Sequence, residues 1–295
     1  NQTSSVETTS IASLDFAPAA DLTPLLYSAL RFGVAALGLA IMFRRRLAKA
    51  WNRRTIGAGL MLGLATGLGM IAQTYGLQRT SPAISAFLTA LYVPFTAILV
   101  WATARVIPGR WLVIGMLLGL IGVSLIGFGG EGVDLGDWSG RSTLLGIVLS
   151  IVGAWFFAAH IVLTDRYGGR VDPVASTVWM VATMALLGLV PLPFMMGSDA
   201  LGSTAFWGAF LADQVAVVSL VLLSIGPTWF AFLAMLVYQR HLDPSRASLL
   251  YAMEPIHAAW LSAVMGVEQL PVVKALGGAL IVIGNLLAER DRSSA

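Results

Sequence analysis

The sequence predicts an all-α polytopic membrane protein, built as a five-plus-five inverted-topology helix repeat. The chain has 295 residues, of which 57% are apolar and only 11% are charged, an excess that suits lipid-exposed helices better than a buried soluble core. Apolar stretches long enough for a helix to cross the hydrocarbon core of a bilayer follow one another along the chain. In addition, the second half of the chain matches the first when shifted by about 161 residues.

Nine stretches qualify as membrane-spanning helices, and a polar segment precedes them. Two interpretations of that segment stay open: it is the outer part of a truncated tenth helix that ends near residues 16–18, or a flexible tail in front of nine helices. The repeat described below favours the truncated helix. The nine predicted spans are Leu25–Phe43, Thr55–Leu77, Ser81–Ala104, Trp111–Phe128, Thr143–Thr164, Val174–Gly197, Gln214–Tyr238, Ala247–Val267 and Leu270–Ala288.

The loops between the spans differ in basic charge. Six Lys and Arg residues lie in the loop Arg44–Arg54, and alternating sides from there puts fourteen basic residues on one side and two on the other. Cytoplasmic loops carry the excess of Lys and Arg, so the C-terminus is predicted to be cytoplasmic. Arg31 and Lys274 fall within spans, near their outer ends, where long side chains can reach the headgroups.

Two segments carry the clearest internal match. Residues 78–94 read QRTSPAISAFLTALYVP and residues 239–255 read QRHLDPSRASLLYAMEP. Both begin with Gln-Arg, both have a proline shortly afterwards, and both carry a proline in the middle of the following helix, Pro94 or Pro255, which is expected to bend it.

Glycines in the next helix extend the match, because Gly115 and Gly122 correspond to Gly277 and Gly284 after a shift of one more residue. Each unit then holds five helices, and an odd number turns the second unit upside down. The predicted units are residues 1–130, with a partial first helix, and residues 143–290. Inverted repeats place a binding site near the midplane and permit alternating access.

These stretches resemble the drug/metabolite transporter superfamily, in particular EamA-type permeases with ten helices. Residues 27–38 (YSALRFGVAALG) resemble the second helix of that family, residues 73–94 its third-to-fourth helix junction, residues 247–255 (ASLLYAMEP) its ninth helix and residues 275–287 its tenth. The resemblance implies a multi-pass carrier of small metabolites in a bacterial cytoplasmic membrane, often an exporter of amino acids or related compounds. The family's first helix usually opens with an apolar stretch and a Trp-Gly pair, which this sequence lacks.

Charged side chains within spans are costly, by roughly 2.5–3.5 kcal/mol on insertion scales, so each is a candidate functional group. Glu254 is the clearest case, and Tyr251 and His257 lie three residues to either side of it on one helix face. Desolvation favours the protonated form of a carboxyl group, which suits Glu254 to carrying a coupling proton. The alternative is that Glu254 binds backbone groups freed by Pro255 or pairs with His257.

Four further residues are candidates for the substrate site. Gln73 is polar and in mid-span, where it would hydrogen-bond either the substrate or a neighbouring helix. Trp155 and Trp229 lie near span centres and are the preferred aromatic lining residues. Glu7 is expected to face the cavity if the first helix is real.

The predicted function is a secondary transporter for a small organic molecule, with protons as the coupling ion. Alternatives are an antiporter of nucleotide-linked or phosphorylated sugars from the same superfamily and a passive facilitator. An intramembrane enzyme is disfavoured because there is no Cys and the three His are scattered. We expect no cofactor and no metal, and no nucleic-acid partner because no basic stripe interleaves with aromatic residues. The glycine repeats such as Gly59-x-x-x-Gly63-x-x-x-Gly67 are small-residue packing seams, not phosphate loops.

Overall fold

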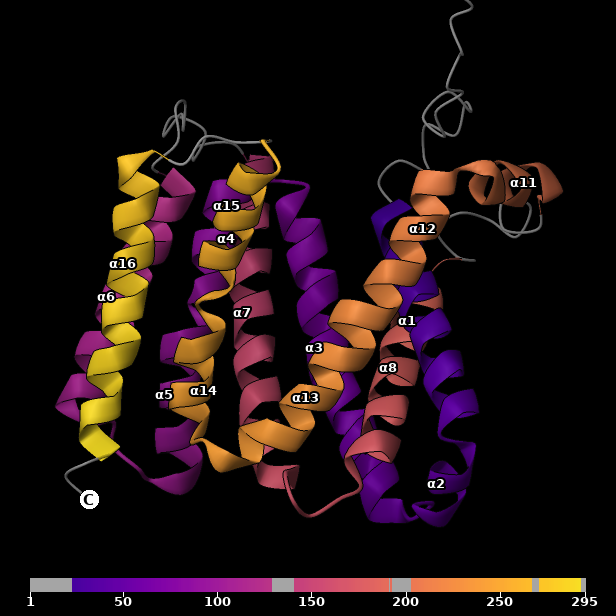
Figure 1. Ribbon diagram of the computed structural model, residues 1–295, viewed down its shortest axis with the longest axis horizontal. Helices are drawn as coiled ribbons and strands as arrows, with labels where there is room; N and C mark the ends of the chain where they lie inside the picture. Colours follow the sequence, from indigo (N-terminus) through magenta and orange to yellow (C-terminus); the bar gives the residue numbers. More distant parts are fainter. Residues whose placement is uncertain (1–22, 129–140, 191, 193–202, 267–270, 293–295) are drawn as a thin grey trace, which may run out of the picture.

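The computed structural model describes residues 23–128, 141–190, 192, 203–266 and 271–292, and in this part of the chain every regular element is a helix. One group of helices comprises α4, α5, α6, α14, α15 and α16, a second comprises α1, α8, α12 and α13, and α3 and α7 lie between them (Figure 1). The bounds are α1 Thr23–Met42, α2 Arg44–Lys49, α3 Arg53–Leu77, α4 Pro82–Ala90, α5 Tyr92–Ala104, α6 Arg110–Phe128, α7 Arg141–Tyr167, α8 Pro173–Leu189, α11 Thr204–Ala212, α12 Gln214–Leu223, η3 Ser224–Phe230, α13 Ala231–Tyr238, η4 Gln239–His241, α14 Pro244–Tyr251, α15 Glu254–Val264, α16 Val272–Ala288 and η5 Glu289–Arg292.

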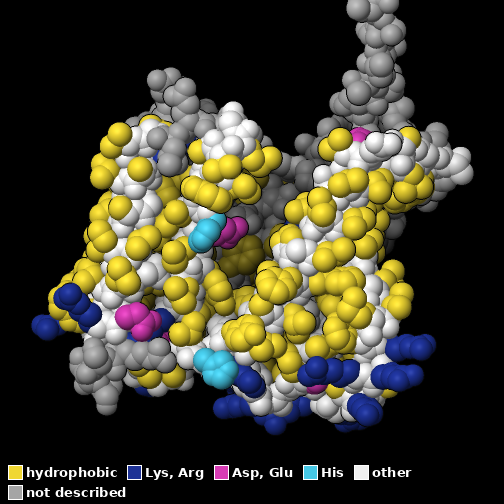
Figure 2. Space-filling model, viewed as in Figure 1, with side chains coloured by type: hydrophobic (Ala, Val, Ile, Leu, Met, Phe, Trp, Pro, Cys, Tyr) yellow, Lys and Arg dark blue, Asp and Glu magenta, His cyan; other side chains and the backbone are white. Residues whose placement is uncertain are grey.

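The all-helical membrane fold is confirmed. Six helices of the described chain are long and apolar enough to cross a bilayer, and α8 and α16 are shorter apolar helices. Hydrophobic side chains cover the flanks of the molecule, while Lys and Arg gather at one end of it (Figure 2). This distribution is what lipid requires of a protein surface, because the hydrocarbon core offers no partner for a charge.

Glycines let α3 approach two helices closely. A Cβ on Gly59 or Gly63 would collide with α8, at Trp179 and Met180. A Cβ on Gly76 would lie 2.6 Å from Ser150 Oγ on α7. The predicted packing seam is therefore present, and it continues as a second seam on the α7 side of the same helix.

Four glycines form the crossing of α6 with α16. A Cβ on Gly115 would lie 2.5 Å from the Gly284 carbonyl oxygen, and one on Gly284 would lie 2.6 Å from the Gly115 oxygen. Gly122 and Gly277 approach each other in the same reciprocal way, at 2.5 and 2.6 Å. Since the repeat equates Gly115 with Gly277 and Gly122 with Gly284, each contact maps onto the other. A self-complementary crossing of this kind is the signature of a twofold axis, here a pseudo-twofold axis between inverted halves.

Two predicted spans are each broken into two half-helices near their mid-span prolines. The first break separates α4 from α5 at Leu91, and the second separates α14 from α15 at residues 252–253. At the second break the Met253 N–H bonds to the Leu250 carbonyl instead of the Leu249 carbonyl. Asn285 Nδ2 of α16 donates to that Leu249 oxygen at 3.2 Å, so the interhelical hydrogen bond satisfies an acceptor that the break exposes.

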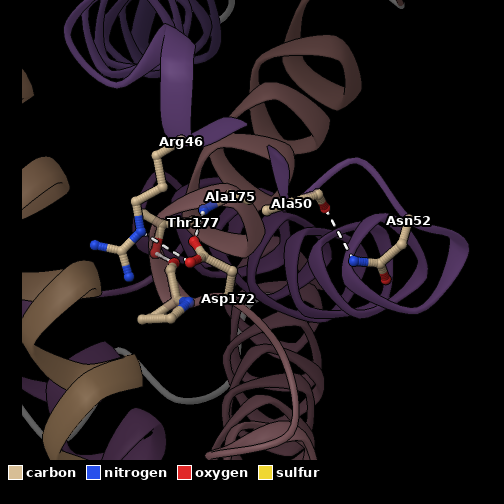
Figure 3. Close-up of polar contacts among 7 residues, drawn as sticks. Arg46, Ala50, Asn52, Asp172, Ala175 and Thr177 are labelled. Atoms are coloured by element: carbon tan, nitrogen blue, oxygen red, sulfur yellow. Dashed lines mark hydrogen bonds and ion pairs between the residues drawn. The ribbon is translucent and has the colours of Figure 1, made fainter. Parts of the chain in front are cut away.

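The basic segment that was predicted as a loop contains the short helix α2. An ion pair joins it to the second half of the chain. Arg46 Nε lies 2.8 Å from Asp172 Oδ2, and the other carboxylate oxygen of Asp172 accepts a hydrogen bond from Ala175 N at 2.9 Å (Figure 3). Asp172 is thus the N-cap of α8. Beside it, Asn52 caps α3 by accepting from Thr55 N at 2.9 Å.

Candidate functional site

The two helix breaks lie close to each other. The half-helix α14 packs on α5, with Val93, Ala97, Leu249 and Ala252 in one buried cluster that Tyr92 joins from its edge. The molecule is hollowed between α14–α15 and α12–α13 (Figure 2). An acidic and a histidine side chain lie next to each other beside this hollow, over α15 (Figure 2), the helix that carries Glu254 and His257.

A chain of hydrogen bonds connects the second break to two other helices. Tyr251 donates through its hydroxyl to Gln239 Oε1 at 3.0 Å, and Gln239 Nε2 donates to the Ile161 carbonyl at 2.7 Å. Gln239 is buried, with 2% of its surface exposed. The Tyr251 hydroxyl is therefore held in place by η4 and, through Gln239, by α7.

Glu254 is the first residue of α15, where the helix dipole favours a negative charge. Its carboxylate interacts electrostatically with the Tyr92 hydroxyl, as does the hydroxyl of Tyr251. His257 is exposed, and its Nδ1 lies 3.0 Å from the Met253 carbonyl. In the described chain Glu254 forms no ion pair with His257, since the salt bridges there are Arg46–Asp172 and Arg246–Asp243.

The structure thus brings together three of the predicted site residues, Tyr251, Glu254 and His257, with Tyr92 and Gln239. Sequence analysis missed the last two. A signal for both was available, because Gln239 begins the repeated Gln-Arg pair and Tyr92 lies two residues before the mid-span Pro94.

Two more candidates lie on the helices behind this cluster. Gln73 Nε2 of α3 donates to Thr89 Oγ1 of α4 at 3.1 Å. Trp155 of α7 is 43% exposed and stacks edge-to-face on Phe95 of α5, with ring centroids 5.4 Å apart. Both side chains contact the first broken helix, and their roles in substrate binding stay predictions.

Trp229 lies in another helix contact, between η3 and α1. Its indole Nε1 donates to the Ala35 carbonyl at 2.8 Å, and its ring fills the space over Gly38. Packing between η3 and α1 is enough to explain why Trp229 is half-buried. Its role in lining the substrate site stays a prediction. Glu7 lies outside the described residues.

One fully enclosed histidine connects α3 with α7. His160 is 5% exposed, and its Nδ1 lies 2.6 Å from Thr66 Oγ1, which donates in turn to the Leu62 carbonyl. Because the Thr66 hydroxyl donates its proton to the Leu62 carbonyl, it accepts from His160, whose Nδ1–H group is the donor. His160 is thus a satisfied interhelical contact. In the described part of the chain, no three His, Asp or Glu side chains are placed to hold a metal ion.

Comparisons with known proteins agree with this architecture. One solved crystal structure superposes with a TM-score of 0.68 over 90% of this chain and 87% of its own, at 19% identity, which shows a common fold. An uncharacterized transporter of Archaeoglobus fulgidus is 24% identical over 266 residues, covering 90% of this chain and 77% of the relative. Two Bacillus subtilis proteins, the uncharacterized transporters YvbV and YoaV, are 27% identical over 71% and 24% identical over 90% of this chain, covering 65% and 86% of their own lengths.

The family model matches the chain twice, once in each predicted repeat. The description of that model is EamA-like transporter family, and the matched residues are 9–128 and 144–289. Together these segments take up most of the chain, and each corresponds to one half of the inverted helix arrangement. The predicted resemblance is confirmed: this chain belongs to the EamA-like transporter family, within the drug/metabolite transporter superfamily.

Proposed function

We propose that this protein is a secondary transporter that exports a small organic metabolite, such as an amino acid or a related compound, by alternating access. The observation that carries the proposal is the meeting of the two broken helices around Tyr92, Tyr251 and Glu254 beside a hollow between the helix groups. Discontinuous helices at the interface of inverted repeats are where secondary carriers bind substrates and coupling ions.

The packing of the four half-helices supports alternating access. The halves α5 and α14 pack together, whereas in the described chain α4 and α15 make no comparable contact. Under the pseudo-twofold relation α4 corresponds to α14 and α5 to α15. Exchanging the roles of the repeats would therefore separate α5 from α14, bring α4 and α15 together, and open the hollow toward the opposite end.

Charge supports an orientation for this cycle. Lys and Arg side chains gather at the end of the molecule where α5 ends and α14 begins (Figure 2). The positive-inside rule places that end in the cytoplasm, of a bacterial cell under this proposal, with the C-terminus on the same side. The arrangement described here is then closed toward the cytoplasm and open toward the outside.

Glu254 is the proposed proton carrier. Its carboxylate lies at the start of α15, is exposed rather than desolvated as the sequence suggested, and interacts electrostatically with the Tyr92 hydroxyl. A group in this position changes its surroundings whenever the half-helices move relative to one another. Protonation and movement are thereby coupled, and a proton gradient can drive export.

The substrate is found first by a resistance screen of cells that overproduce the protein, against a panel of toxic amino acid analogues. The compound identified is then followed in inside-out vesicles. A coupled carrier accumulates it when a pH gradient is imposed and shows counterflow, whereas a passive facilitator equilibrates it without accumulation.

In those vesicles, Glu254→Gln is expected to abolish accumulation driven by the pH gradient while leaving expression intact. Glu289→Gln is the matched control, because it makes the same chemical change in η5, beyond α16, and it is expected to accumulate substrate normally. Full gradient-driven accumulation by Glu254→Gln would remove Glu254 from the mechanism. Exchange restricted to phosphorylated or nucleotide-linked sugars would favour the antiporter alternative.

A further inference from the structure

A guanidinium group lies well inside the first described span. Arg31 is eight residues from Thr23, the first residue of α1, which places it about 12 Å along the helix axis. Its Nε donates to Thr228 Oγ1 of η3 at 3.0 Å, an interhelical contact that the sequence did not suggest.

No acidic side chain neutralises this charge within the described chain. The two salt bridges there involve Arg46 and Arg246. Among the described residues the Arg31 side chain donates a hydrogen bond through Nε alone, so its two Nη groups are available to an added acceptor. The guanidinium also lies over the Phe32 ring, 5.0 Å from its centroid, but a charge within a span that has no counter-ion is costly and is a candidate functional group.

Tyr27 supplies a second, independent observation. It lies four residues before Arg31 and therefore one turn away on the same helix face. Its hydroxyl is buried and has no hydrogen-bond partner in the described chain, although it lies near Ser219. A buried hydroxyl without a partner carries a desolvation penalty, and this one also interacts electrostatically with Arg31.

The backbone on both sides of Arg31 is held to η3, a π-helical turn that contains Pro227. The Ser224 hydroxyl lies 2.7 Å from the Leu220 carbonyl and 3.0 Å from the Arg31 carbonyl and shares its one proton between them, while Trp229 Nε1 donates to the Ala35 carbonyl at 2.8 Å. Thr228 Oγ1 donates to the Leu223 carbonyl at 2.9 Å, so it accepts from Arg31 in a fixed orientation. The guanidinium is thereby pre-organised, and π-helical turns are frequent at functional sites.

We propose that Arg31 and Tyr27 form a binding site for one oxyanion. The free edge of a guanidinium matches the two oxygens of a carboxylate or phosphate, and the Tyr27 hydroxyl would donate to the same group. The anion is either the carboxylate of a small organic acid or the phosphate of an anionic lipid headgroup. Only in the first case does the site contribute to substrate choice, and that reading rests on the proposed transport function.

The test measures binding by the full chain, purified in detergent, without requiring transport. Melting temperatures are recorded with benzoate and with benzamide, its neutral analogue of the same shape, and after adding phosphatidylglycerol or phosphatidylcholine. A ligand that occupies its site is expected to raise the melting temperature by about 2 °C or more. We expect this rise with benzoate but not benzamide, or with phosphatidylglycerol but not phosphatidylcholine.

Variants identify the site. Arg31→Gln is expected to abolish the anion-dependent rise, and Arg31→Lys to weaken binding several-fold because the forked geometry is lost. Tyr27→Phe is expected to weaken binding without lowering the melting temperature of the ligand-free protein, since its hydroxyl has no partner to lose. Arg79→Gln is the matched control and should retain the rise, because Arg79 lies just beyond α3 and its Nη1 donates to the Tyr75 carbonyl of that helix.

An Arg31-dependent rise with benzoate assigns the site to small carboxylates, and one with phosphatidylglycerol but not benzoate or phosphatidylcholine assigns it to an anionic lipid headgroup. The proposal is overturned if neither anion raises the melting temperature of the unmodified chain, or if Arg31→Gln keeps the rise. It is also overturned if anions bind only after Glu7→Gln, since the guanidinium would then serve an internal carboxylate. Failure of transport in vesicles would leave this binding result unchanged, so the two proposals fail separately.

Discussion

Adding a methyl group at the crossing of α6 and α16 should destabilise the protein, and the geometry sets the magnitude. A Cβ on Gly115 would lie 2.5 Å from the Gly284 oxygen, whereas an ordinary contact begins at 3.4 Å, so the helices must separate by about 0.9 Å. A gap of that size forfeits a quarter to a half of the dispersion attraction of the facing atoms. Overpacking of this kind costs about 1–3 kcal/mol, and we expect that loss for Gly115→Ala.

The pseudo-twofold relation adds a stricter expectation. Gly277→Ala makes the equivalent change in the second repeat and should cost a similar amount. Combining Gly115→Ala with Gly284→Ala should cost less than the sum, because one separation of the helices accommodates both methyl groups.

Thermal unfolding in detergent, followed by tryptophan fluorescence, measures these costs, at about 1.5–2 °C of melting temperature per kcal/mol for a chain of this size. Gly57→Ala is the control, because nothing lies within 4 Å of its added Cβ and Ala is the better helix former. Its melting temperature should be unchanged or higher. If Gly115→Ala melts at the same temperature as Gly57→Ala, the close crossing is not as described.

Two further substitutions test individual hydrogen bonds in the same unfolding assay. Asn285→Leu removes the donor to the Leu249 carbonyl and should cost about 0.6–1.7 kcal/mol, the range for hydrogen bonds between membrane helices; an unchanged melting temperature would mean that this carbonyl has another partner. Asp172→Ala should cost about 0.5–2 kcal/mol because it removes the cap on Ala175 N. Arg46→Gln breaks only the exposed ion pair with Asp172 and should cost less than about 1 kcal/mol. Equal losses in these two variants would argue against the capping role.

Periodicity and glycine spacing predicted much of the membrane fold from the sequence. The spans, the inverted repeat and the seam on α3 all follow from patterns that a helix imposes on sequence. The repeat also paired Gly115 with Gly277. It did not show that Gly115 contacts Gly284. A match between repeats tells which residues are equivalent, but it does not tell which helices lie next to the pseudo-twofold axis.

The candidate site was harder to predict, because the clearest signal in the sequence is a charged residue within a span. That signal identifies Glu254 and its neighbours on one helix face. Tyr92 and Gln239 carry no charge, and their roles arise from tertiary contacts between helices that are far apart in sequence. Arg31 was expected at the outer end of its span, and the π-helical turn that places Thr228 within its reach has no clear sequence signal beyond Pro227.

The two interrupted spans are not supported alike, and under the proposed alternating access this would make one break harder to bend than the other. In α14–α15 a side chain of a third helix, Asn285, holds the Leu249 carbonyl, so any change of bend there must carry α16 along or break that bond. At Leu91, within the described chain, the break is closed by α4's own backbone, with Leu91 N donating to the Leu88 carbonyl at 3.2 Å. A rocking motion would then be absorbed first by the front half of the chain, while the back half turns with its neighbour as one piece.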